Sequence, residues 1–143
     1  MDQVSDMAYF WVYVVALAMF LGIDFVWLSS MVNRFYRAEI GGLMREQPNM
    51  VAAGGFYLFY ILALLVLVIV PQLRSGGSLG KVFMLGACAG AMAYGTYDFT
   101  NLAVLKDWTL KVSLGDLAWG TVLTGTVSTL TVVIARKMNW LVG

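Results

Sequence analysis

The chain has 143 residues and a net charge of +1, with 61% hydrophobic and only 12% charged residues. A soluble domain usually has about a quarter of its residues charged, so this composition excludes an ordinary soluble domain and indicates a membrane protein. The near-neutral charge gives no reason to expect nucleic acid as a partner. Histidine is absent and Cys88 is the single cysteine, which excludes imidazole ligands and a disulfide within the chain.

Four stretches of the chain are almost free of charge. Asp24, Asp98 and Asp116 are the only charged residues inside them, and the second stretch has none. Each stretch exceeds the roughly 20 residues that a helix needs to cross a bilayer, and a spanning segment must satisfy its own backbone hydrogen bonds. The sequence therefore predicts an all-α integral membrane four-helix bundle, a single transmembrane domain over 1–143, with helices near 8–31, 50–71, 82–104 and 114–135.

The longest connection follows the first helix, and its segment 34–45 mixes basic and apolar residues. Two interpretations remain open: a short interfacial helix lying on the membrane surface, or a solvated loop. Its three arginines, together with the acidic N-terminus, favour the cytoplasmic side for this connection.

Small and hydroxyl residues recur along the third and fourth predicted helices. Small side chains let two membrane helices approach closely, so we expect these two faces to pack together. The residues are Gly86, Ala87, Gly90 and Ala91 in the third helix, and Gly120, Thr121, Thr124, Gly125, Ser128 and Thr129 in the fourth.

The three membrane carboxylates are expected near one membrane face. The first and third helices run in the same direction, Asp24 and Asp98 lie toward their ends, and Asp116 lies near the start of the returning helix. At about 1.5 Å per residue, Asp24 and Asp98 fall roughly 10 Å below that face. A charged group at such a depth costs at least about 2.5–3.5 kcal/mol, so something must offset it.

The carboxylates and their neighbours predict a polar pocket that is open toward the connection after the first helix. Tyr94 and Asn101 lie four residues before and three after Asp98, on the same helix face. Tryptophans and basic residues gather at the same end of the bundle. The expected ligand-binding residues are Asp24, Asp98, Asp116, Tyr94, Asn101, Trp27, Trp119 and Arg37.

Structural interpretations of these residues stay open beside the functional one. Ser113 and Asp116 have the spacing of a capping box at a helix start. Asp24 and Asp98 are also consistent with hydrogen bonds or ion pairs that hold helices together, with a basic residue of the connections reaching inward, although ligand or proton binding is the preferred interpretation. Four tyrosines are best interpreted as aromatic residues of the membrane interface, namely Tyr9, Tyr13, Tyr57 and Tyr60.

The segments Tyr94-Gly95-Thr96-Tyr97-Asp98-Phe99-Thr100-Asn101-Leu102 and Asp116-Leu117-Ala118-Trp119-Gly120 carry a resemblance that extends over nearly the whole chain. With Asp24-Phe25-Val26-Trp27-Leu28, Phe35-Tyr36 and Ala52-Ala53, the chain resembles an uncharacterised family of small four-span bacterial membrane proteins. The resemblance implies a multi-pass protein of the bacterial inner membrane. It assigns no activity and no catalytic residue.

Three functions fit these observations. The first is binding or transport of a small molecule, a lipid or a proton, with a homodimer as the expected transporting unit because four spans are few. The second is an enzyme acting on a lipid or isoprenoid, with two carboxylates as acid and base or three holding Mg²⁺. The third is a structural subunit of a membrane complex. Catalysis is left undecided, and no cofactor is expected. Membrane lipid is an expected partner.

Overall fold

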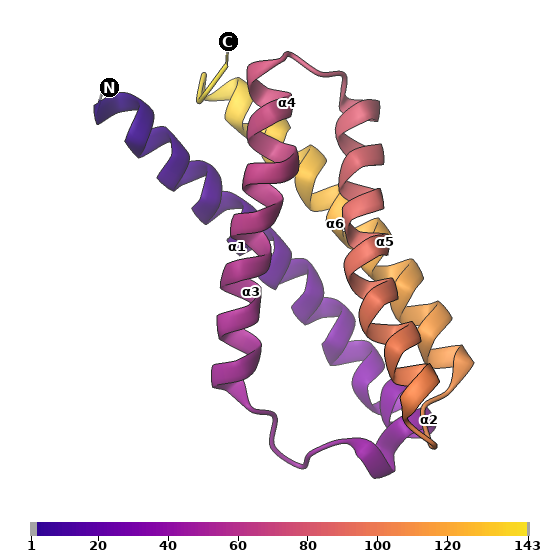
Figure 1. Cartoon of the computed structure of the whole chain (residues 1–143). Helices are drawn as coiled ribbons and strands as arrows, with labels where there is room; N and C mark the ends of the chain where they lie inside the picture. The colour runs from indigo at the N-terminus through magenta and orange to yellow at the C-terminus, as the bar shows by residue number, and fades with distance from the viewer. Residues whose placement is uncertain (1–2, 143) are drawn as a thin grey trace.

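The computed structural model describes residues 3–142, with side chains described from Asp6 onward. The described chain is helical throughout, apart from its turns and connections, and has no strand. Figure 1 shows the helices side by side, with the two ends of the chain near each other and α2 at the opposite end. The elements are α1 (Gln3–Met31), η1 (Val32–Tyr36), α2 (Arg37–Ile40), η2 (Gly41–Leu43), α3 (Met50–Leu64), η3 (Leu65–Ile69), α4 (Val70–Arg74), α5 (Leu79–Val104) and α6 (Leu110–Lys137).

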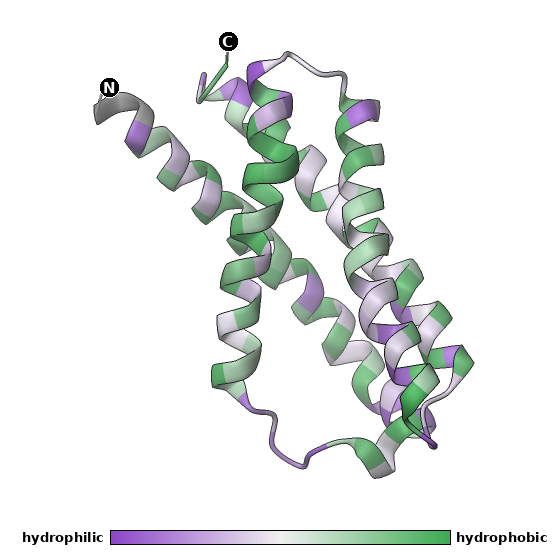
Figure 2. Ribbon diagram, viewed as in Figure 1, coloured by the Kyte–Doolittle hydropathy of each residue, from purple (hydrophilic) through white to green (hydrophobic). Residues whose placement is uncertain are grey.

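The expected helices are present, close to the predicted bounds, and the all-α membrane bundle is confirmed. Within the described residues, three helical segments are long and apolar enough to cross a membrane: Asp6–Leu43, Met50–Arg74 and Leu110–Lys137. At 26 residues α5 is long enough as well, but its glycines and the polar run from Tyr94 to Asn101 make it less apolar than these three. Figure 2 shows hydrophobic residues over most of the bundle and hydrophilic ones toward its two ends.

The segment after α1 continues the first helix rather than forming a separate one. A π-helical turn, η1, leads into α2 and then into the 3₁₀ turn η2, so that the helical path ends at Leu43. The segment 34–45 is therefore helical up to Leu43 rather than an irregular loop.

The second membrane segment passes through a π-helical turn at η3 and continues past Pro71 to Arg74. Proline has no amide hydrogen to donate, and a helix accommodates it where the regular hydrogen-bond ladder is already shifted. The turn between the second and third membrane segments therefore begins only at Ser75. Helix α5 starts after Ser78, whose hydroxyl accepts a hydrogen bond from the amide of Lys81 at 3.3 Å.

The small faces of α5 and α6 meet, as predicted from their composition. A Cβ atom added at Gly86 would lie 2.6 Å from the hydroxyl of Ser128, and one at Gly90 would lie 2.3 Å from the carbonyl oxygen of Gly120. Because real Cβ atoms do not come this close to other atoms, glycine is what allows the two backbones to approach.

Helix α6 begins earlier than predicted, and this overturns one interpretation of Asp116. The N-cap of α6 is Thr109, whose hydroxyl accepts a hydrogen bond from the amide of Val112 at 3.2 Å. Ser113 lies inside the helix, so Ser113 and Asp116 do not form a capping box.

The apolar core occupies the end of the bundle near the chain termini. Side chains of α1, of the α3–η3–α4 segment and of α6 pack there, including Val12, Phe20, Ile61, Leu123 and Val127, all at most 1% exposed. Tighter packing at this end leaves the other half of the bundle with a cavity.

Candidate functional site

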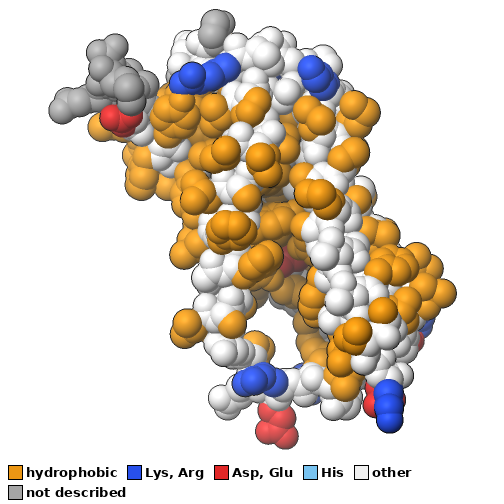
Figure 3. Space-filling view, viewed as in Figure 1, with side chains coloured by type: hydrophobic (Ala, Val, Ile, Leu, Met, Phe, Trp, Pro, Cys, Tyr) orange, Lys and Arg blue, Asp and Glu red, His pale blue; other side chains and the backbone are white. Residues whose placement is uncertain are grey.

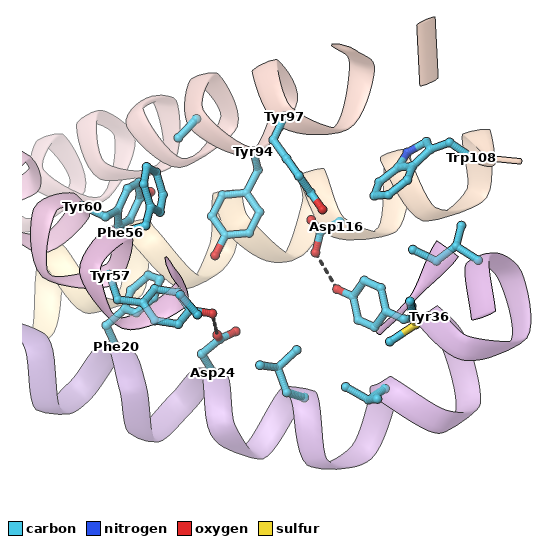
Figure 4. A pocket seen from close by; sticks show the side chains of 16 residues that line it. Phe20, Asp24, Tyr36, Phe56, Tyr57, Tyr60, Tyr94, Tyr97, Trp108 and Asp116 are labelled. Atoms are coloured by element: carbon cyan, nitrogen blue, oxygen red, sulfur yellow. Dashed lines mark hydrogen bonds between the residues drawn. The ribbon is translucent and has the colours of Figure 1, made fainter. Parts of the chain in front are cut away.

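A cavity of about 640 Å³ lies among α1, η1, α2, α3, α5 and α6. Figure 4 shows its lining from close by. The lining side chains are Phe20, Asp24, Leu28, Val32, Tyr36, Ile40, Met44, Ala53, Phe56, Tyr57, Tyr60, Ala93, Tyr94, Tyr97, Trp108 and Asp116.

The cavity opens sideways, between α3 and α5. Figure 3 shows a hollow between these two helices, with an acidic side chain visible inside it and hydrophobic side chains over the surrounding surface. The segment 44–49 crosses below the hollow, as Figure 1 also shows. The opening expected toward the connection after the first helix is therefore directed instead at the flank of the bundle.

Asp24 projects from α1 and is held by donors from two other helices. Its Oδ2 accepts a hydrogen bond from the phenol of Tyr57 on α3 at 3.2 Å, and its Oδ1 accepts one from the indole N–H of Trp119 on α6 at 3.0 Å. The carboxyl is 6% exposed and forms no ion pair with a described residue. The basic residues considered as partners do not reach it.

A second chain of contacts runs from Trp27 to Asp116. The indole of Trp27 stacks on that of Trp119, with 4.2 Å between the ring centroids and 6° between the planes. The indole N–H of Trp27 donates to the phenol oxygen of Tyr36 at 3.1 Å, and the hydroxyl of Tyr36 donates to Oδ1 of Asp116 at 2.5 Å. The stacked indoles thus connect the surroundings of the two cavity carboxyls.

Asp98 lies behind Asp116, between α5 and α6, and does not line the cavity. It is fully buried at 0% exposure. The hydroxyl of Ser113, one helical turn before Asp116 on α6, donates to its backbone carbonyl oxygen at 3.1 Å, which places the carboxyls of Asp98 and Asp116 next to each other. Neither carboxyl oxygen of Asp98 accepts a hydrogen bond from a donor group of the described residues. Two carboxyls this close repel each other when both are ionised.

Tyr94 points its hydroxyl into the cavity, between Asp24 and Asp116, as Figure 4 shows. Its ring lies on Gly120 of α6, where an added Cβ would come within 2.1 Å of the ring. Gly120 therefore makes room for this tyrosine. Tyr97, one turn later on α5, also lines the cavity, so Tyr94 and Tyr97 present their side chains from the same side of α5.

The other expected site residues lie outside the lining. Arg37 is exposed and Asn101 is half-buried. Trp27 and Trp119 lie behind the lining. Trp27 donates a hydrogen bond to Tyr36, and Trp119 donates one to Asp24. The lining contains no lysine or arginine. No group of three potential metal-ligating side chains gathers anywhere in the described chain, so the three carboxylates do not form the Mg²⁺ site considered for an enzyme.

Tyr57 and Tyr60 are more than interface aromatics, and that interpretation is wrong for both. Tyr57 donates to Asp24, and the hydroxyl of Tyr60 shares a 2.8 Å hydrogen bond with that of Thr124. A signal was present in the sequence, since Ala53, Phe56, Tyr57 and Tyr60 recur at the spacing of one helix face. Tyr36 carried no comparable signal, because its approach to Asp116 depends on the path of η1.

The comparisons with known proteins agree with the membrane character of the chain. No curated protein and no solved structure matches it. The sequence profile of one family matches residues 9–133, which covers the cavity, its carboxyls and all the long helices except their outer ends. The chain therefore belongs to the family described as "Predicted membrane protein (DUF2177)", a membrane protein family of unknown function.

Proposed function

We propose that this protein binds an amphipathic organic cation in the cavity. The observation that carries the proposal is the composition of the lining, which combines two carboxyls with eight aromatic rings and has no basic side chain. The rings are those of Phe20, Tyr36, Phe56, Tyr57, Tyr60, Tyr94, Tyr97 and Trp108.

Charge supports a cationic ligand. Both oxygens of Asp24 accept hydrogen bonds, from Tyr57 and Trp119, and these contacts orient the carboxyl without neutralising it. A carboxylate without a cationic partner is costly inside a membrane protein. A ligand cation offsets that cost directly, and aromatic faces within about 6 Å of a cation add roughly 0.5–2 kcal/mol each.

The size of the cavity and the position of its mouth support an amphipathic ligand. Cavities of roughly 300–1,000 Å³ suit small molecules, and this one is about 640 Å³. Four of the lining side chains, Leu28, Val32, Ile40 and Met44, are apolar and not aromatic, and they suit a hydrocarbon portion. Because the mouth lies on a flank covered by hydrophobic side chains (Figure 3), a ligand with such a portion enters from the lipid.

The membrane arrangement forms part of the proposal. We take α5 to cross the bilayer as well, since its 26 residues rise about 39 Å at 1.5 Å each, more than the roughly 30 Å hydrocarbon core. We place the protein in the bacterial inner membrane, as the family resemblance implies. Should the cation be transported, four helices are few to enclose a path, and a homodimer is the working unit.

The test uses two probes of similar shape and opposite charge, tetraphenylphosphonium and tetraphenylborate. Their binding to the purified full chain in mild detergent is measured by calorimetry. We expect saturable binding of the phosphonium only. Asp24→Asn keeps the side chain's shape and removes its charge, so we expect phosphonium affinity to fall at least about tenfold, or about 1.4 kcal/mol.

The matched control is Asp107→Asn, which removes an exposed carboxylate in the turn after α5 and should bind as the unsubstituted protein does. Equal binding of the two probes, or unchanged phosphonium binding by a folded Asp24→Asn variant, would contradict the proposal. Native mass spectrometry of protein extracted from its own membrane then identifies the natural ligand.

A further inference from the structure

The buried carboxyl of Asp98 has no part in the cation site as described so far. It is fully buried, and the described residues provide no donor for either of its oxygens. Its position is fixed by the backbone, because the hydroxyl of Ser113 on α6 donates to the carbonyl oxygen of Asp98 at 3.1 Å. Ser113 in turn accepts a hydrogen bond from the indole N–H of Trp108 at 3.0 Å. The close packing of α5 and α6 therefore holds Asp98 next to α6.

Asp116 follows Ser113 by one helical turn and lies between Asp98 and the cavity. It lines the cavity and accepts the hydrogen bond of Tyr36. Because Ser113, one turn before Asp116 on α6, holds the backbone of Asp98, the carboxyl of Asp116 lies next to that of Asp98. Two carboxylates in such contact have no hydrogen between them, whereas one carboxyl and one carboxylate form a strong hydrogen bond. Pairs of this kind therefore hold one proton between them.

The groups that face the pair do not provide another positive charge. From α1 comes the carboxyl of Asp24 and from η1 the phenol of Tyr36, and Tyr97 approaches from α5 itself. The nearest lysine along α6, Lys111, lies on the surface and pairs with Glu39 at 2.6 Å. No described residue provides a positive charge to the pair, so only a proton or a bound ligand can neutralise it.

We propose that the Asp98–Asp116 pair is a proton site at which a proton and the ligand cation compete. The inference rests on the proposed cation-binding function. When a cation enters beside Asp116, the O–H bond of the pair breaks and the proton passes to solvent, and the carboxylate left behind is neutralised by the cation. One positive charge replaces another, so the net charge of the cavity is unchanged. At most one proton leaves for each cation bound.

The experiment counts protons during phosphonium binding. Titration calorimetry at one pH, in two buffers that differ in ionisation enthalpy, gives the number of protons released per tetraphenylphosphonium bound. We expect a measurable fraction of a proton, up to about one, and an affinity that weakens as the pH is lowered, by up to about tenfold per pH unit. In Asp98→Asn the amide donates permanently to Asp116, so proton release should disappear while the probe still binds.

Asp107→Asn is the control and should release protons as the unsubstituted protein does. Infrared spectroscopy of the unsubstituted protein provides a second measurement that needs no variant: the absorption of a protonated carboxyl should weaken when the phosphonium is added. Binding without proton release, or without an infrared change, overturns the inference and leaves the proposed function standing. Absence of any saturable phosphonium binding overturns both.

Discussion

Tyr36 donates a 2.5 Å hydrogen bond to Oδ1 of Asp116, across 80 positions of sequence. This contact joins the end of the first membrane segment to α6, and it fixes one of the two carboxyls of the cavity. Tyr36 is the last residue of the π-helical turn η1, which follows α1. The same phenol oxygen accepts the indole N–H of Trp27.

Removing that phenol should destabilise the protein. Tyr36→Phe leaves the carboxyl of Asp116 and the indole of Trp27 without their partner, which costs about 1–3 kcal/mol of unfolding free energy. Tyr94→Phe is the matched comparison, because the hydroxyl of Tyr94 points into the cavity without a hydrogen-bond partner in the described chain. We expect little change in its unfolding free energy but weaker phosphonium binding. Equal destabilisation of the two variants, in thermal unfolding in detergent, would contradict the assignment.

A methyl group at Gly120 should displace Tyr94. The added Cβ would lie 2.1 Å from the ring, and overpacking of this kind typically costs about 1–3 kcal/mol. Gly120→Ala should therefore lower both the unfolding midpoint and phosphonium affinity. Gly54→Ala on α3 is the control, since no atom lies within 4 Å of its added Cβ. Were both variants as stable as the unsubstituted protein, the close contact of Tyr94 with α6 would be wrong.

Trp119→Phe tests whether the indole N–H matters to Asp24. Phenylalanine keeps an aromatic ring against Trp27 but removes the donor to Oδ1 of Asp24. Hydrogen bonds to charged groups contribute about 1.5–3 kcal/mol, so the unfolding free energy should fall by about that amount. Trp11→Phe, at a side chain that is 43% exposed and stacked on Trp140, is the control. A loss of the same size in both variants would indicate ring packing rather than the hydrogen bond.

The sideways opening predicts which solutes reach the cavity. A nitroxide label on Ala53→Cys, in a Cys88→Ser background, should collide with oxygen, which concentrates in lipid, more than with a charged water-soluble nickel chelate. Collision rates are read from electron paramagnetic resonance saturation in a reconstituted bilayer. Labels on Phe59→Cys, where the side chain is 63% exposed on α3, and on Asp107→Cys provide the lipid and water references. A label on Ala53→Cys that behaves like the one on Asp107→Cys would move the mouth of the cavity to the aqueous side.

The sequence by itself determined the class of protein and most of the helix bounds. Long uncharged stretches leave a chain only the choice of helix inside a bilayer, and the glycines of α5 with the small residues of α6 indicated which two helices pack most closely. The unusual carboxyls were visible for the same reason, since a charge in an apolar run is costly.

Tertiary structure alone decided which groups those carboxyls meet. The pairing of Asp98 with Asp116 depends on the alignment of α5 with α6 along their axes, which the small residues of the two helices do not specify. Tyr36 reaches Asp116 only through the path of η1. The sideways opening follows from the distance between α3 and α5, which is set by packing at the other end of the bundle. Local sequence encodes each helix, whereas the site depends on how several helices settle against one another.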